Sequence, residues 1–172
     1  MASTVRIPLD LRMPGSVNAG NSFWTDVVLT AATPDLDMGH WEFVKDVVGD
    51  VFGLVTIPNT IGATPAAKII LSIAANATTG ATSLFVQGLC VADGQTYDAA
   101  LDTAITTQDI TVPATAYFRK EVSFTLATSG GSFPVVAKDE MLIRIVHSGT
   151  DANDTLAVNT LLIAAYLEID LA

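Results

Sequence analysis

Residues 67–75 read AKIILSIAA, and this run indicates the class of fold that the rest of the chain must join. Apolar side chains occupy every second position, at Ala67, Ile69, Leu71, Ile73 and Ala75. An alternation of two residues places these side chains on one face of a β-strand, with Lys68 and Ser72 on the other face. The run therefore predicts a strand that has one face in a hydrophobic core.

The same alternation recurs along the chain. It is clear in residues 5–11, 118–126, 141–145 and 161–169, and further strands are expected near residues 24–31, 51–58, 82–91 and 105–112. The composition agrees, because 21 Thr and 17 Val favour strands, whereas 14 Asp against only 4 Glu favour turns over helices. About nine strands are predicted.

The spacing of these strands indicates an all-β antiparallel sandwich. Residues 32–50 and 92–104 are too long to be tight hairpins, and long crossings between sheets favour a Greek-key jelly roll. Residues 96–103 allow one short helix. No linker or repeat divides the chain, so we expect a single jelly-roll domain at 13–172, preceded by an N-terminal strand or arm at 1–12.

Charge and apolar content exclude several classes of partner. The net charge of -10 is unfavourable for nucleic-acid binding, which needs clusters of Lys and Arg. No apolar run approaches the roughly 20 residues that cross a bilayer, so no membrane partner is expected. The N-terminus, MASTVRIPLDLRMPG, has no signal-peptide pattern, which predicts synthesis and retention in a cytoplasm or export inside a larger particle.

Residues suited to catalysis or metal binding are sparse, so no enzyme and no cofactor are predicted. The two histidines, His40 and His147, lie far apart in the sequence, and no nucleophile-elbow or phosphate-loop motif is present. Residues 151–154, DAND, loosely resemble a calcium loop but lack its glycine and terminal glutamate. Asx side chains bonded to their own backbone explain this loop equally well, so a structural turn and a calcium site both stay open.

Several predicted strands carry apolar residues on their second face as well. Those chosen as candidates for an oligomer interface are Ile70, Phe85, Leu89, Leu162 and Tyr166. Extended apolar patches are rare on a monomer, which favours burial by neighbouring subunits, either in a homo-oligomer or in a larger shell. The alternative is that the chain's own loops or sheets cover these faces.

A set of short segments resembles the small jelly-roll structural proteins of tailed bacteriophages. They are residues 41–44 (WEFV), 53–58 (GLVTIP), 68–71 (KIIL), 93–98 (DGQTYD), 142–151 (LIRIVHSGTD), 154–157 (DTLA) and 161–170. The resemblance implies a structural pair between Arg144 and Asp154 around the last turn. His147 and Ser148 depart from the family's pattern, which has a second charged residue there.

The resemblance implies a capsid decoration (cement) protein, expected to be a trimer, on the outer surface of a phage head. Its partners would be the major capsid protein and its own copies, and its contact segment would be the N-terminal arm, with Val5, Ile7 and Leu9 between Arg6 and Arg12. The same segment could instead be the first strand of the domain's own sheet.

Two other functions stay open at this point. One is a tail or fibre module that binds a host-surface glycan, because aromatic side chains stack on sugar rings; the candidates are Trp24, Trp41, Tyr97, Tyr117 and Tyr166. The other is an enzyme with a cupin-like jelly roll, which would need clustered histidines that this chain does not supply.

Overall fold

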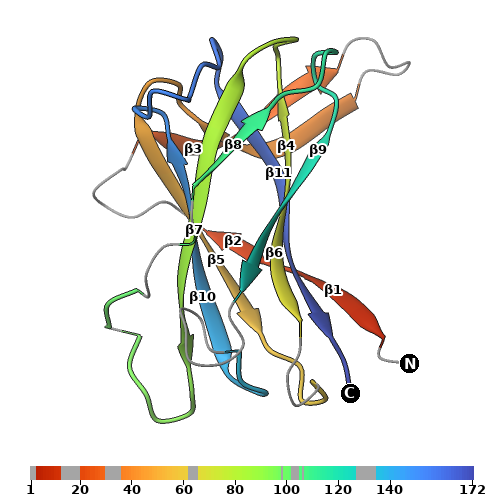
Figure 1. The fold of residues 1–172 in the computed structure, drawn as a ribbon, viewed down its shortest axis with the longest axis vertical. Coiled ribbons are helices and arrows are strands. Elements are labelled where there is room, and N and C mark those ends of the chain that lie inside the picture. The colour runs from red at the N-terminus through yellow and green to blue at the C-terminus, as the bar shows by residue number, and fades with distance from the viewer. Residues whose placement is uncertain are drawn as a thin grey trace.

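The chain folds into two antiparallel sheets that pack face to face, as seen in a computed structural model (Figure 1). The structure describes residues 3–12, 20–29, 36–61, 66–97, 99–101, 105, 107–126 and 135–172. Its strands are β1 Thr4–Pro8, β2 Asp10–Arg12, β3 Ser22–Leu29, β4 Leu36–Phe43, β5 Val48–Thr56, β6 Ala67–Ala75, β7 Ala81–Val91, β8 Gln108–Thr111, β9 Lys120–Leu126, β10 Glu140–Ser148 and β11 Thr160–Asp170.

The strand order confirms the jelly-roll sandwich expected from the sequence. One sheet has the order β3-β4-β11-β6-β9, with β1 also paired to β11, and the other has the order β2-β5-β10-β7-β8. Neighbours in each sheet come from distant parts of the chain, so most connections cross from one sheet to the other. Every regular element in the described ranges is a strand. These ranges contain no helix that is long and apolar enough to cross a bilayer.

The core lies between the two sheets and is built from the alternating residues of each strand. Ile69, Leu71 and Ile73 of β6 face Val86 of β7 and Ile143 of β10 across the interior, and all five are essentially inaccessible to solvent. Burial of an aliphatic side chain of this size stabilises a fold by about 1.5–3 kcal/mol. The alternating apolar residues of 67–75 therefore face the hydrophobic core, as the sequence predicted.

The N-terminal segment forms part of this sandwich. β1 pairs with the C-terminal half of β11, and β2 pairs with β5 in the other sheet. Leu9, between them, is buried, and its backbone N–H donates to the carbonyl oxygen of Ala165 at 2.9 Å. Val5, Ile7 and Leu11 also pack against the chain's own core, and N and C termini lie at one end of the molecule (Figure 1). Residues 4–12 therefore form strands of the domain's own sheets, which is the alternative to a contact arm. Arg6 pairs with Glu121 and Glu168, and Arg12 pairs with Asp10.

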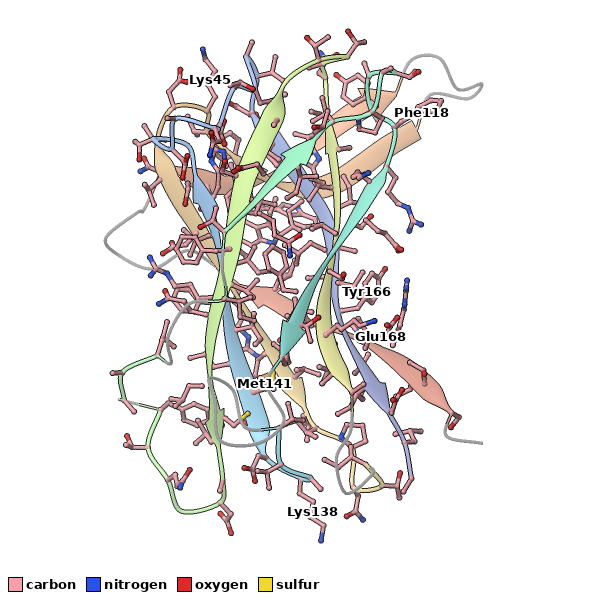
Figure 2. The ribbon with its side chains drawn as sticks, in the orientation of Figure 1. Lys45, Phe118, Lys138, Met141, Tyr166 and Glu168 are labelled. Atoms are coloured by element: carbon pink, nitrogen blue, oxygen red, sulfur yellow. The ribbon has the colours of Figure 1, made fainter. Side chains whose placement is uncertain are left out.

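A bulge in β11 corrects the predicted alternation of residues 161–169. The register shifts between Leu162 and Ala164, so that Leu162 points into the core and is fully buried. Beyond the bulge, Ala165, Leu167 and Ile169 face inward, whereas Tyr166 and Glu168 lie on the outer side of the strand (Figure 2). A bulge of this kind adds one residue to a strand and reverses the faces that follow it.

The five candidates for an oligomer interface therefore do not form a single exposed face. Leu162 is inaccessible and Ile70 is only 4% exposed within a single chain, so neither can supply an oligomer contact, and that assignment is wrong for both. Phe85, Leu89 and Tyr166 are half-buried. A trimer stays a prediction.

Two details of the predicted layout also change. β4 lies inside the segment 32–50 that was expected to be a connection, and the N-terminal run is divided into β1 and β2, so the described strands exceed nine. The described positions within 96–103, which are 96, 97 and 99–101, contain no helix, and positions 98, 102 and 103 lie outside the described residues.

Candidate functional site

A surface groove forms where β11 changes partners. Its N-terminal end pairs with β4 at residues 160–162, and its C-terminal half pairs with β1 from Tyr166 onward. Ile163, Ala164 and Ala165 lie between these two pairings and line a groove of about 470 Å³. The crossing from β1 to β2, with Pro8 to Leu11, also lines the groove, and so do Trp24 and Trp41. The bulge is thus the local cause of the groove, and we call it the aromatic groove.

The two tryptophans of the groove are cross-strand neighbours. Trp24 of β3 is directly opposite Trp41 of β4, which places both indoles on the same face of the sheet. Their ring centroids are 5.9 Å apart at an interplanar angle of 73°, an edge-to-face contact. Trp41 is 5% exposed and anchored in the core, whereas Trp24, on the edge strand, is 57% exposed. The buried ring therefore orients a large aromatic surface that solvent can reach.

The aromatic groove is also lined by hydrogen-bonding groups. Tyr166 contributes a half-buried ring and a hydroxyl. Asp10 contributes a carboxylate whose Oδ2 accepts from Arg12 Nε at 3.0 Å and from Nη2 at 2.7 Å. An amphipathic lining of this type suits a ligand that has both apolar surface and hydroxyl groups.

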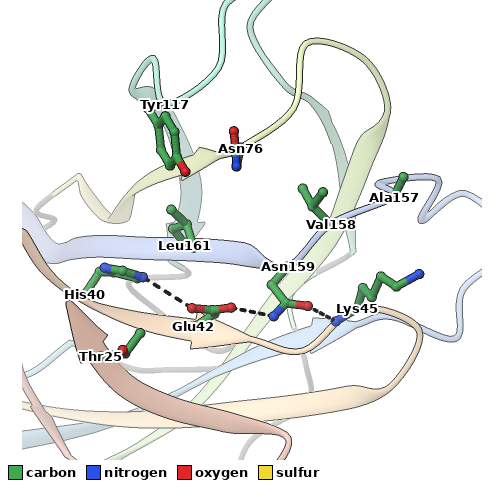
Figure 3. A pocket seen from close by; sticks show the side chains of 10 residues that line it. All are labelled: Thr25, His40, Glu42, Lys45, Asn76, Tyr117, Ala157, Val158, Asn159 and Leu161. Atoms are coloured by element: carbon green, nitrogen blue, oxygen red, sulfur yellow. Dashed lines mark hydrogen bonds and ion pairs between the residues drawn. The ribbon is translucent and has the colours of Figure 1, made fainter. Parts of the chain in front are cut away.

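A second hollow, of about 410 Å³, lies on the other face of the same two strands (Figure 3). His40 and Glu42 alternate along β4 with Trp41 and Phe43, so their side chains point away from the aromatic groove. Thr25 joins them from β3, where it is paired with His40. Asn76, Tyr117 and Asn159 complete the polar lining, and Leu161 lies among them. We call this the polar pocket.

Hydrogen bonds hold the floor of the polar pocket in place. The Asn159 side-chain amide donates to Glu42 Oε1, and the Lys45 backbone N–H donates to Asn159 Oδ1 at 2.9 Å. His40 Nε2 lies 3.6 Å from Glu42 Oε2. The Glu42 carboxylate is therefore held by the Asn159 amide, which is itself held by the backbone of Lys45.

Tyr117 stands above this floor in an unusual backbone conformation. Its φ is 62°, and its N–H donates to the Ala75 carbonyl oxygen at 2.7 Å. A left-handed conformation is rare for a residue with a bulky side chain, and surrounding structure must hold it. In Figure 3 the Tyr117 ring and Asn76 lie across the pocket from Glu42, so polar groups line both sides of one space.

The aromatic candidates named from the sequence are thus divided among three places. Trp24, Trp41 and Tyr166 meet in the aromatic groove, and Tyr117 lines the polar pocket. Tyr97 lies apart, 51% exposed, with its hydroxyl bonded to Glu140. Glu42, Asn76 and Asn159 were not identified from the sequence, because nothing local indicates that residues so far apart share a pocket.

The predicted pair of Arg144 and Asp154 is wrong. Arg144 binds Asp50 instead, with Nη2 at 2.6 Å and Nε at 2.8 Å from Oδ2, because these residues lie on the adjacent strands β10 and β5. Asp154 lies 2.8 Å from His147 Nε2 and accepts the Ser83 backbone N–H at 2.9 Å. Burial lowers the pKa of His147, and the neighbouring Asp154 carboxylate partly opposes this effect.

The 151–154 loop makes the bonds of a structural turn. The Asn153 backbone N–H donates to Asp151 Oδ1 at 2.9 Å, and the Asp154 N–H donates to the Asp151 carbonyl oxygen at 3.0 Å. The Asp151 N–H in turn donates to the Ser148 carbonyl oxygen at 2.8 Å. Among the residues that the structure describes, no group of three or more His, Cys, Asp or Glu side chains is placed to hold a metal ion.

Comparison with solved structures returns carbohydrate-binding modules. The chain is similar to a family 35 module from Clostridium thermocellum, with 14% identity, a TM-score of 0.48 and coverage of 98% of both chains. A family 11 module of a cellulosomal cellulase of the same organism has 8% identity, a TM-score of 0.41 and coverage of 97% of this chain and 94% of that one. A xylan-binding domain from Paenibacillus barcinonensis has 8% identity, a TM-score of 0.43 and coverage of 96% and 87%.

No protein-family model matches the sequence, and no curated protein matches it. The expectation of a capsid cement protein is corrected here. Two of the apolar residues on which it relied, Ile70 and Leu162, are buried by the chain itself and cannot supply the contacts that it requires.

Proposed function

We propose that the protein is a non-catalytic glycan-binding module and that the aromatic groove is its binding site. The observation that carries this proposal is Trp24, which keeps 57% of its surface exposed while the buried Trp41 holds its ring at a fixed angle. A large exposed indole costs solvation free energy unless a ligand covers it, and here it lines a groove rather than a convex surface.

The chemistry of the groove fits a sugar. A pyranose ring has an apolar face of C–H groups, which packs on an aromatic ring, and a rim of hydroxyls, which needs donors and acceptors. Trp24 offers the aromatic surface, while Tyr166 and Asp10 offer polar groups within the same groove. Rigid aromatic side chains lose little conformational entropy on binding, so a preset Trp pair favours this kind of recognition.

The charge of the protein narrows the class of glycan. The net charge is -10, so polysaccharides rich in uronate or sulfate are repelled over the range of the Debye length, about 8 Å at physiological salt. The ligand we expect is therefore a neutral polysaccharide.

Affinity electrophoresis tests this function directly. The protein is run in native gels that contain xylan, β-1,4-galactan, mixed-linkage β-glucan or dextran. We expect retardation in at least one gel and its loss in Trp24→Ala, because the substitution removes the stacking surface without opening the core. Phe118→Ala is the matched control, since Phe118 is 61% exposed, points outward and lines neither the groove nor the pocket (Figure 2).

The outcome against the proposal is also specific. Unretarded migration in all four gels argues against glycan binding by this module. Equal retardation of Trp24→Ala and the unsubstituted protein places any binding outside the aromatic groove.

A further inference from the structure

The polar pocket is the feature that glycan binding at the aromatic groove does not explain. Both hollows are built on β3 and β4, but on opposite faces, because Trp24 and Trp41 alternate with Thr25 and Glu42 along the two strands. A ligand in one hollow therefore makes no contact with the lining of the other. A ligand in the aromatic groove therefore does not explain the polar pocket.

The polar pocket is organised before any ligand arrives. Glu42 accepts a hydrogen bond from the Asn159 amide, and Asn159 is itself fixed by the backbone of Lys45. Tyr117 is held opposite by its bond to Ala75. Polar side chains that are oriented in advance lose less entropy on binding, which is the usual benefit of preorganisation.

The groups in the pocket match a compact ligand with several hydroxyls. Glu42 accepts hydrogen bonds, the amides of Asn76 and Asn159 both donate and accept, and Tyr117 adds a hydroxyl and a ring. Its volume of about 410 Å³ is near the lower end for small-molecule sites, so it suits one or two sugar rings, free or as part of a longer chain.

The charges in the pocket favour a neutral ligand. Glu42 brings a carboxylate to the centre, while the Lys45 ammonium lies 3.1 Å from Asp46 Oδ2 and is already paired. An anionic sugar would meet the Glu42 carboxylate without a cation to balance it. A neutral sugar unit would meet acceptors and donors alone.

We infer that the polar pocket is a second, independent glycan site, which binds one neutral sugar unit and makes the module bivalent. The inference rests on the proposed function for the class of ligand, but the two sites depend on different residues. A module with two sites on opposite faces can hold two chains at once, and the resulting avidity exceeds the affinity of either site.

Chemical-shift mapping on the 15N-labelled protein separates the two sites. The probes are xylotetraose, β-1,4-galactotriose, a mixed-linked β-glucan tetrasaccharide and panose, with glucuronic acid as the anionic comparison. We expect two groups of shifted amides, one around Trp24, Trp41 and Ala164 and one around Glu42, Asn159 and Tyr117, which saturate at different concentrations. Glucuronic acid should shift neither group.

Two variants assign each group of shifts. Trp24→Ala should remove the first group and leave the second. Glu42→Gln keeps the shape but removes the charged acceptor, and a lost hydrogen bond to a charged group should weaken the second group roughly tenfold or more. Glu121→Gln is the matched control, because Glu121 is a partly exposed strand glutamate outside both sites, and the spectra themselves report whether each variant is folded.

Each outcome bears on one of the two proposals. Shifts at the aromatic groove alone overturn the second site and leave the proposed function intact. Shifts at the polar pocket alone support the second site and contradict binding at Trp24. A spectrum that none of the four neutral probes changes overturns both.

Discussion

Asp154 joins three segments of the chain through one carboxylate oxygen. Its Oδ2 accepts from the Ser83 backbone and lies 2.8 Å from His147 Nε2, while the side chains of Asp154 and His147 are 2% and 1% exposed. The sequence-based pairing of Asp154 with Arg144 failed because the partner depends on which faces of β7 and β10 meet the turn. Strand register, rather than proximity in the sequence, decided which charge the carboxylate meets.

The buried histidine predicts how stability depends on pH. Burial lowers the pKa of His147 in the folded state below the ordinary histidine value of 6.5, so the unfolded chain binds more protons than the folded protein between these two pKa values. The contribution of His147 to stability is therefore complete above about pH 6.5 and is lost as the pH falls toward the folded-state pKa.

Urea unfolding at pH 5 and pH 8 measures this effect. The unsubstituted protein should lose more unfolding free energy between pH 8 and pH 5 than His147→Gln, which has no group that titrates at that position. Parallel losses in the two proteins would show that His147 does not titrate differently in the folded and unfolded states.

At the scale of elements, alternation identified most strands but not their irregularities. β6, β9 and β10 lie within a few residues of their expected positions, because each has apolar residues at every second position on its core face. The bulge in β11 was missed because Leu161, Leu162 and Ile163 are all apolar, so the pattern does not show which of them turns inward. β4 was missed because Gly39 and the polar His40 and Glu42 interrupt its short apolar pattern.

The candidate site was predicted by residue type but not by arrangement. Aromatic side chains could be named from the sequence as a stacking surface, and three of them meet in one groove. Their meeting depends on the pairing of Trp24 with Trp41 and on the bulge beside Ala164, and both are long-range features. The polar pocket depends on such features entirely, since Glu42 and Asn159 are 117 residues apart.

The N-terminal strands carry a prediction of their own. Deleting residues 1–12 removes β1, β2 and the buried Leu9, and with them part of the wall of the aromatic groove. Loss of a buried leucine alone costs about 2–5 kcal/mol. We expect a clearly lower urea midpoint for the truncated protein and little change for Arg12→Ala, whose side chain is exposed. A truncated protein with an unchanged midpoint would mean that this segment is not part of the fold.

At the scale of the whole molecule, the sandwich places two different hollows on opposite faces of one strand pair. The aromatic groove offers stacking surface and the polar pocket offers directed hydrogen bonds, within a protein whose net charge of -10 disfavours anionic ligands. The combination is what a module for neutral glycans requires. Binding energy in such a module should come from the exposed tryptophan and specificity from the polar groups.

Both tryptophans of the protein line the aromatic groove, so intrinsic fluorescence reports on this site alone. The most direct measurement is a titration of tryptophan emission with xylan, β-1,4-galactan, mixed-linkage β-glucan and dextran. We predict a saturable blue shift with at least one of them, as the ligand covers Trp24, and no shift in Trp24→Ala, where only the buried Trp41 emits. Emission that none of the four polysaccharides changes would contradict glycan binding at the groove.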